Sequence, residues 1–166
     1  MKKKDYLGST IIGLHPYEKV KEDCHKMKEG DLASRARFVS EVYNLFDMHS
    51  RLVCNAPSHN GTEYYSDMEL ENKTDIGIFP ILVGNPRPSW YTMKKKGYKF
   101  MNLAIGTDER IVDLTKEKIS EGYKLMVFDN VCDTGLTAMQ SINALHNAGI
   151  ENVEFITYGY TDNFIN

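Results

Sequence analysis

The strongest chemical signal in the sequence lies within residues 124–145, where an apolar stretch ends in an acid, Asp129. The turn at residues 133–137, Asp-Thr-Gly-Leu-Thr, follows and leads into an amphipathic stretch. Open α/β sheets bind ligands at the carboxyl ends of their strands, and the free amides and dipole of a helix N-terminus attract anions. Gly135 lets the backbone approach an anion closely, and two threonine hydroxyls add donors. The segment predicts a site for a phosphate monoester, with Asp129 nearby for hydroxyl groups or a metal-bound water.

A purely structural interpretation of this turn stays open. Asp133 or Thr134 can be the N-cap of the following helix, with Gly135 as an ordinary turn residue. The sequence contains no P-loop motif, no Gly-x-Gly-x-x-Gly fingerprint and no Gly-x-Ser-x-Gly elbow. Hydride transfer on a dinucleotide and P-loop phosphoryl transfer therefore lose their usual support.

The segments that must position this turn alternate between apolar and amphipathic patterns. The expected strands are residues 51–56, 75–84, 100–106, 124–129 and 152–160, and the expected helices are residues 31–48 (capped by Asp31), 113–122, 136–147 and, as a further candidate, 62–73. Residues 15–30 are a short helix or an irregular arm, and residues 85–98 are expected to be a mobile loop. Apolar strands that alternate with helices predict an α/β fold with a parallel sheet covered on both faces.

Composition restricts the class of protein. A chain of 166 residues with 42% hydrophobic residues predicts a single domain with its own core. The net charge of −3 disfavours a nucleic-acid partner, and the lack of an 18-residue apolar window disfavours a membrane partner. Three widely spaced cysteines argue against disulfides and a structural zinc site. The apolar stretch behind the three N-terminal lysines is too short for a signal peptide, so we expect a cytoplasmic protein.

Residues 125–137, Leu-Met-Val-Phe-Asp-Asn-Val-Cys-Asp-Thr-Gly-Leu-Thr, resemble the phosphoribosyl-pyrophosphate (PRPP) motif of type I phosphoribosyltransferases. That motif has four hydrophobic residues, two acids, two apolar residues, a variable residue and then Thr-Gly-x-Thr. The match departs from it only at Asn130, where the family usually has its second acid. The resemblance implies one phosphoribosyltransferase-like domain over residues 1–166, with a three-layer parallel-sheet core. It also implies a small hood or flexible-loop subdomain, expected from residues 1–30 and 62–98.

The resemblance implies roles for the motif residues. The loop that would hold the 5′-phosphate consists of Asp133, Thr134, Gly135, Leu136 and Thr137. Asp129 would contact the ribose hydroxyls, and Asn130 would share that work without the negative charge of an acid. Mg²⁺ would enter with PRPP and needs no direct protein ligand, with Asp129 as a candidate contact through water.

The resemblance also implies a pyrophosphate loop after the first core strand. Its expected residues are Ser58, His59, Asn60 and Gly61, with a non-proline cis peptide near Ser58 and His59. An ordinary exposed turn is the alternative. Asp133 is the expected general base, a position that leans toward a 6-oxopurine acceptor such as hypoxanthine, guanine or xanthine. The candidate lid or base contacts are Arg87, Trp90, Tyr91 and Lys94, whose alternatives are packing or a solvated face.

These expectations favour a magnesium-dependent phosphoribosyltransferase, a pentosyltransferase of nucleotide salvage. It would transfer ribose 5-phosphate from PRPP to a nitrogenous base and release pyrophosphate. Its partners would be PRPP and a nucleobase, with a homodimer as a candidate assembly. Two alternatives remain: a non-catalytic PRPP- or nucleotide-binding regulatory protein on the same fold, and a flavodoxin-like α/β domain with an unrelated phosphate ligand.

Overall fold

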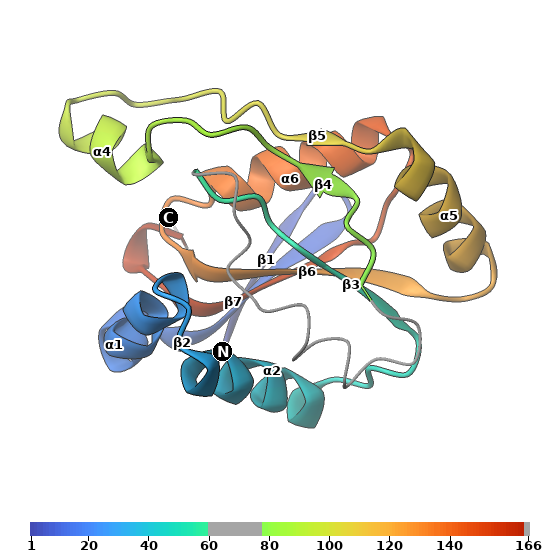
Figure 1. Cartoon of the computed structure of the whole chain (residues 1–166), viewed down its shortest axis with the longest axis horizontal. Coiled ribbons are helices and arrows are strands. Elements are labelled where there is room, and N and C mark those ends of the chain that lie inside the picture. Colours follow the sequence, from blue (N-terminus) through green and yellow to red (C-terminus); the bar gives the residue numbers. More distant parts are fainter. Residues whose placement is uncertain (60–77, 165–166) are drawn as a thin grey trace.

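A mixed, mostly parallel five-stranded sheet forms the centre of the molecule (Figure 1). The computed structural model describes residues 1–59 and 78–164. In spatial order the strands are β1 (Lys2–Tyr6), β2 (Ser9–Pro16), β7 (Glu154–Tyr160), β6 (Lys124–Cys132) and β3 (Arg51–Asn55). Only β1 is antiparallel to its neighbour, because it forms a hairpin with β2. Leu7 and Gly8 both have positive φ in this turn, as a two-residue hairpin loop requires.

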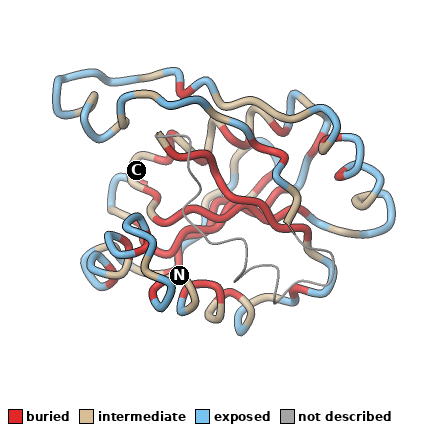
Figure 2. Tube along the Cα trace, in the orientation of Figure 1, coloured by how far each residue is buried: buried red, intermediate tan, exposed pale blue. Residues whose placement is uncertain are grey.

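Helices cover both faces of the sheet (Figure 1). One face carries α1 (Tyr17–Lys28) and α2 (Leu32–Leu45), and the other carries α5 (Glu109–Ser120) and α6 (Leu136–Asn147). The side chains of β6 alternate between the two cores: Leu125 and Val127 join one cluster, and Met126 and Phe128 join the other. Because both faces of this strand are covered, residues 125–128 are all apolar, and the central strands are buried along most of the trace (Figure 2).

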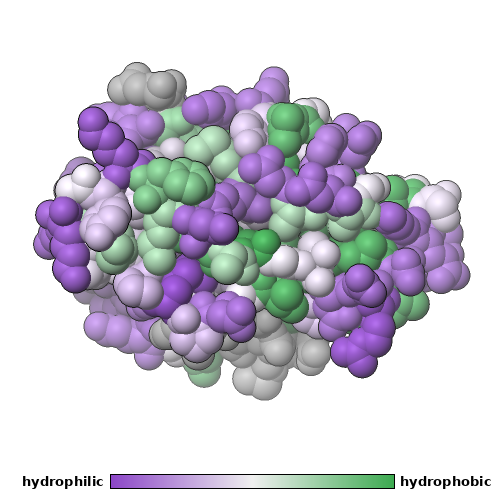
Figure 3. All heavy atoms as spheres, turned by 90° about the horizontal axis from the view of Figure 1, so that it is seen from above, coloured by the Kyte–Doolittle hydropathy of each residue, from purple (hydrophilic) through white to green (hydrophobic). Residues whose placement is uncertain are grey.

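Residues 78–107, which we call the strap, cross the α6 side of the molecule. The strap contains β4 (Leu82–Val83), α4 (Trp90–Lys95) and β5 (Gly106–Thr107). A 3₁₀ turn (Asp162–Phe164) follows β7. The strands β4 and β5 pair with each other as a separate two-stranded sheet. The face seen from this side is largely hydrophilic, with separate apolar patches (Figure 3). No helix within the described ranges has both the length and the apolar character needed to cross a membrane.

Several expected elements are confirmed. The helix expected over residues 31–48 is α2, and its N-cap is Asp31, whose Oδ2 accepts a hydrogen bond from the Ser34 amide at 2.9 Å. The helix expected over residues 136–147 is α6, and the strands expected near residues 51–56, 124–129 and 152–160 are β3, β6 and β7. Residues 15–30 contain a helix, α1, rather than an irregular arm.

Other expectations are wrong in their bounds or in kind. The helix expected at residues 113–122 is present as α5, but it begins four residues earlier, at Glu109, because Asp108 caps it by accepting from the Arg110 amide. The strand expected over residues 100–106 is reduced to Gly106–Thr107, and Phe100 is 64% exposed, so this apolar stretch is not a core strand. Residues 85–98, expected as a loop, contain α4.

The strand expected over residues 75–84 is also wrong in extent. Within its described part only Leu82–Val83 is a strand, with one isolated bridge at Ile78, because Pro80 cannot donate to a ladder. Residues 75–77 and the candidate helix at residues 62–73 lie outside the described residues. The hairpin of β1 and β2 is missed by the sequence analysis and makes the sheet mixed rather than parallel throughout.

Candidate functional site

A cavity of about 600 Å³ lies at the carboxyl ends of β3 and β6. Its described walls are α1, the turn after β3, the strap with α4, and the turn between β6 and α6. The structure brings these predicted site residues to the cavity: His59, Arg87, Trp90, Tyr91, Asp129, Asn130, Asp133, Thr134, Gly135, Leu136 and Thr137. Ser58 is buried beside it, and Lys94 reaches it through Asp133. Asn60 and Gly61 lie outside the described residues.

The turn between β6 and α6 opens the N-terminus of α6 onto this cavity. Gly135 is the N-cap, with a φ of 83°, a conformation that glycine adopts without strain. The alternative that Asp133 or Thr134 caps the helix is wrong, because no side chain caps α6 in the usual way. The Thr134 hydroxyl accepts only a long 3.4 Å hydrogen bond from the Leu136 amide. The first amides of α6 therefore face a cavity that can hold an anion.

Asp129 is buried at this cavity, with only 4% of its surface exposed. Burial raises the pKa of its carboxyl to about 7, although the hydrogen bond from the Asn130 amide and the charges of Lys28 and Arg87 act in the opposite direction. The backbone N–H of Asn130 donates to Asp129 Oδ1 at 2.8 Å. Burial therefore favours the neutral form of this carboxyl more than at an exposed aspartate, and a nearby cation or hydroxyl donor would favour its ionised form.

The side chain of Asn130 is turned toward the backbone of α1 and of its own strand. Its Nδ2 donates to the carbonyl oxygen of Cys24 on α1 at 3.4 Å, and its Oδ1 accepts from the Val131 amide at 2.9 Å. Asn130 is buried, and β6 continues past it to Cys132 while pairing with β7. A carboxylate at this position has no N–H to donate to the α1 carbonyl. The departure from the PRPP motif thus coincides with a contact that an acid cannot make.

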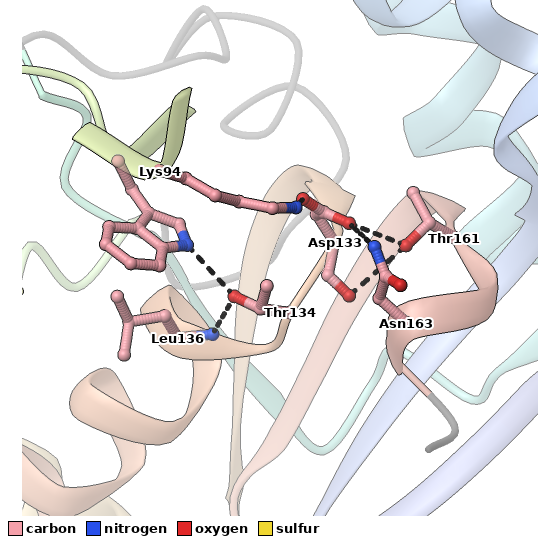
Figure 4. Close-up of polar contacts among 7 residues, drawn as sticks. Lys94, Asp133, Thr134, Leu136, Thr161 and Asn163 are labelled. Atoms are coloured by element: carbon pink, nitrogen blue, oxygen red, sulfur yellow. Dashed lines mark hydrogen bonds and ion pairs between the residues drawn. The ribbon is translucent and has the colours of Figure 1, made fainter. Parts of the chain in front are cut away.

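Asp133 is engaged on both carboxylate oxygens (Figure 4). Lys94 Nζ donates to Oδ2 at 2.7 Å, while Thr161 Oγ1 and Asn163 Nδ2 donate to Oδ1 at 2.8 and 2.9 Å. Partial burial alone would raise the pKa of Asp133, but the hydrogen bonds from Lys94, Asn163 and Thr161 outweigh it and hold the pKa below its usual value. In this arrangement Asp133 is ionised and a weak base.

The turn after β3 is fixed by Arg87. The Arg87 amide donates to the His59 carbonyl at 2.6 Å, and its guanidinium donates to the Ser58 carbonyl at 3.1 Å. The peptide bond between Ser58 and His59 is trans, so the expected cis peptide is wrong at this bond. Burial, and then the charges of Lys28 and Arg87, lower the pKa of His59. Positive charge thus surrounds this side of the cavity.

The helix α4 packs over the turn between β6 and α6. Trp90 Nε1 donates to Thr134 Oγ1 at 3.1 Å, next to the ion pair of Lys94 with Asp133 (Figure 4). Beyond α4 the strap is tied down again by Gln140, which accepts from the Leu103 amide and donates to the Met101 carbonyl. The strap is therefore anchored at both ends, and α4 holds the turn through two side chains that contact motif residues.

The sequence analysis misses the wall contributed by α1. Tyr17, Lys21, His25 and Lys28 all line the cavity, at intervals of four, four and three residues. These intervals place them on one side of the helix. The signal was present as a polar stripe beside the buried stripe of Val20, Cys24 and Met27. It could not be read as a site without knowing which side of α1 faces the cavity.

Neither the scan against protein-family models nor the search of curated proteins returns a match for this chain. Among the described residues, no group of three or more His, Cys, Asp or Glu side chains is arranged to hold a metal ion directly. The functional argument therefore depends on the geometry of the cavity.

Proposed function

We propose that this protein is a magnesium-dependent phosphoribosyltransferase that transfers ribose 5-phosphate from PRPP to a nitrogenous base. One observation carries the proposal: the Gly135 turn opens onto the same cavity as the turn after β3. A ligand with phosphates at both ends of a sugar requires two such anion sites that share one cavity. A ligand with a single phosphate would need only the N-terminus of α6 and not the turn after β3.

Each end of the ligand would meet a different set of groups. The first amides of α6 and the hydroxyls of Thr134 and Thr137 would bind the 5′-phosphate. Asp129 would accept hydrogen bonds from the ribose hydroxyls. On the other side, Arg87 and the backbone near His59 would hold the pyrophosphate, in the region where the charges of Lys28 and Arg87 act on both His59 and Asp129.

The donor set fits a magnesium ion that arrives with PRPP. The cavity offers one deeply buried carboxylate, Asp129, and Mg²⁺ commonly keeps several waters while binding one or two carboxylates and substrate phosphates. When bound, the ion would neutralise charge on the pyrophosphate. Asp129 would contact it through water.

Catalysis on this proposal is mainly electrostatic. As the bond to pyrophosphate breaks, the ribose becomes cationic, and ionised Asp129 stabilises that charge from within a buried site. Asp133 would take the proton from the acceptor nitrogen once Lys94 releases it, because the ion pair makes this carboxylate a weak base. The strap would exclude water while α4 is closed.

The first experiment measures pyrophosphate release with Mg²⁺, PRPP and a panel of nucleobases, together with the shift in melting temperature on adding PRPP. A ligand at 100 times its Kd adds about 2.7 kcal/mol of stability. We expect Asp133→Asn to slow turnover with PRPP affinity nearly unchanged, and Asp129→Ala to weaken both. Asp113→Asn, an exposed site on α5, is the matched control. Equal loss of PRPP affinity in the Asp129 and Asp133 variants would contradict the role of Asp133 as base.

A non-catalytic PRPP or nucleotide sensor is the second candidate. It is favoured by Asn130, which replaces an acid of the motif and binds α1, and by the ion pair that holds Asp133. A sensor would bind PRPP tightly and release no pyrophosphate with any base. If neither PRPP nor a nucleoside monophosphate shifts the melting temperature, both candidates fail.

A further inference from the structure

The α1 wall of the cavity presents cations and aromatic rings. We define this wall as Tyr17, Lys21, His25 and Lys28, which all line the cavity from one side of α1. Lys21 makes no ion pair with any described residue, unlike Lys26, which pairs with Glu22 on the same helix. Lys21 thus carries a positive charge into the cavity that no ion pair with a described residue neutralises.

The acids that line the described cavity are already committed. Asp129 is buried and bound by the amide of its neighbour, and both oxygens of Asp133 accept hydrogen bonds, with Lys94 on one of them. No carboxylate of α1 lines the described cavity. A ligand on the α1 side therefore meets many donors and few free acceptors.

Two flat surfaces face this region. Tyr17 is half-buried on α1, and its hydroxyl lies 2.8 Å from His25 Nε2. Tyr91 on α4 is 65% exposed and also lines the cavity. Burial is the largest cause that raises the pKa of Tyr17 above its ordinary value. Each of these rings offers a face on which a planar heterocycle in the cavity can stack.

We propose that the α1 wall is the acceptor site, and that it selects a planar ring with oxo or carboxylate oxygens over a ring with amino groups. The inference rests on the proposed function, because it assigns the acceptor class for the same cavity. Oxo and carboxylate oxygens accept a charge-assisted hydrogen bond from the ammonium of Lys21, and one more from whichever member of the Tyr17–His25 pair keeps a free donor. An amino group gains nothing from the two lysine ammonium groups, which are donors only, and finds its acceptors only in the tyrosine oxygens and a neutral His25 ring.

Binding can be followed through Trp90, the one tryptophan in the sequence, which lies at the cavity. The probes are xanthine, orotate and adenine, titrated without PRPP and with saturating PRPP and Mg²⁺. We expect xanthine or orotate to bind at least about tenfold more tightly than adenine. Lys21→Met should weaken binding of the oxygen-rich rings by about tenfold, the value of one charge-assisted hydrogen bond, and leave adenine nearly unchanged. Tyr17→Ala should weaken all three rings by about tenfold, because one stacking face is lost.

The control is Lys19→Met, which removes the same charge from an exposed position of α1 that does not line the cavity. The proposal is overturned if adenine binds as tightly as the oxygen-rich rings, if the two lysine variants behave alike, or if no ring binds under either condition. These are binding measurements, so they are independent of turnover. If the rings bind in the expected order while PRPP neither binds nor reacts, the proposed function fails and the ring site stands.

Discussion

Replacing Asp129 with Asn should remove a large pH dependence of folding stability. Burial raises the pKa of Asp129 to about 7 in the folded protein, against 3.8 for an ordinary aspartate. The folded state therefore holds this proton more tightly than the unfolded state. Its contribution is fully present below about pH 3.8, declines as the pH rises, and is lost once the pH has passed about 7.

The expected magnitude follows from the separation of the two pKa values. Roughly three pH units at about 1.4 kcal/mol each give a total on the order of 4 kcal/mol. About 3 kcal/mol of this change falls between pH 5 and pH 8, where urea denaturation is easily measured. Asp129→Asn keeps the shape of the side chain and cannot ionise, so its stability should stay level through this range as far as this site is concerned.

The assay compares unfolding free energies of wild type and Asp129→Asn at several pH values and constant ionic strength. Other titratable groups are common to both proteins, so their contributions to the unfolding free energy cancel in the difference. Asp113→Asn removes an exposed carboxylate and should reproduce the wild-type slope. Parallel curves for wild type and Asp129→Asn would refute the idea that Asp129 is a desolvated, proton-exchanging group.

Three further predictions concern the turn and its neighbours. Gly135→Ala and Gly122→Ala each force alanine into positive φ where its Cβ meets no close atom, so both should cost about 1 kcal/mol of stability. Only Gly135→Ala should also weaken binding of inorganic phosphate or PRPP, by about tenfold, and equal binding by both variants would contradict the anion site. Asn130→Asp should destabilise the protein by about 2 kcal/mol at pH 8, because the hydrogen bond to α1 is lost and a second buried carboxylate ionises. The loss of stability should be smaller at pH 5, and urea titrations at both pH values test this. Lys94→Met should change stability by less than about 1 kcal/mol at pH 7, since the pair is partly exposed, and should shift Trp90 fluorescence as α4 is released. Because the pKa of Asp133 is lower in the folded protein than the ordinary 3.8, its ionised carboxylate stabilises the fold above about pH 3.8. This stabilisation is lost as the pH falls through the lower folded pKa, and the loss should be smaller in Lys94→Met because one cause of the low pKa is removed.

Local patterns predicted the parts of the fold that local interactions determine. The apolar run of β6, the Gly135 turn and α6 are contiguous in the chain, and an N-cap and a buried strand leave clear signatures. The edge strand β1 left none, because its Lys2–Tyr6 segment is largely exposed and lysine-rich, as edges that avoid aggregation often are. The apolar stretch near Phe100 misled the analysis in the opposite direction, since that side chain is exposed.

Contacts between distant segments determine the rest of the site, and the sequence could not supply them. Trp90 and Thr134 are 44 residues apart, and Lys94 and Asp133 are 39 apart. Nothing in residues 85–98 indicates that α4 will pack on the turn between β6 and α6 rather than extend into solvent. The predicted base, Asp133, was therefore named without the ion pair that now governs its basicity.

Asn130 connects the departure from the motif with the wall that the sequence did not reveal. Its amide binds the backbone of α1 at Cys24, and α1 carries Lys21 and the other residues of the wall into the cavity. An acid at position 130 would place negative charge in the sugar site but would repel that carbonyl and loosen α1. If the proposed function holds, Asn130 leaves the ribose without the negative charge of the motif's second acid, and its contact with α1 helps to position the acceptor wall. Asn130→Asp should then alter acceptor binding more than phosphate binding, because the turn at Gly135 does not depend on this contact.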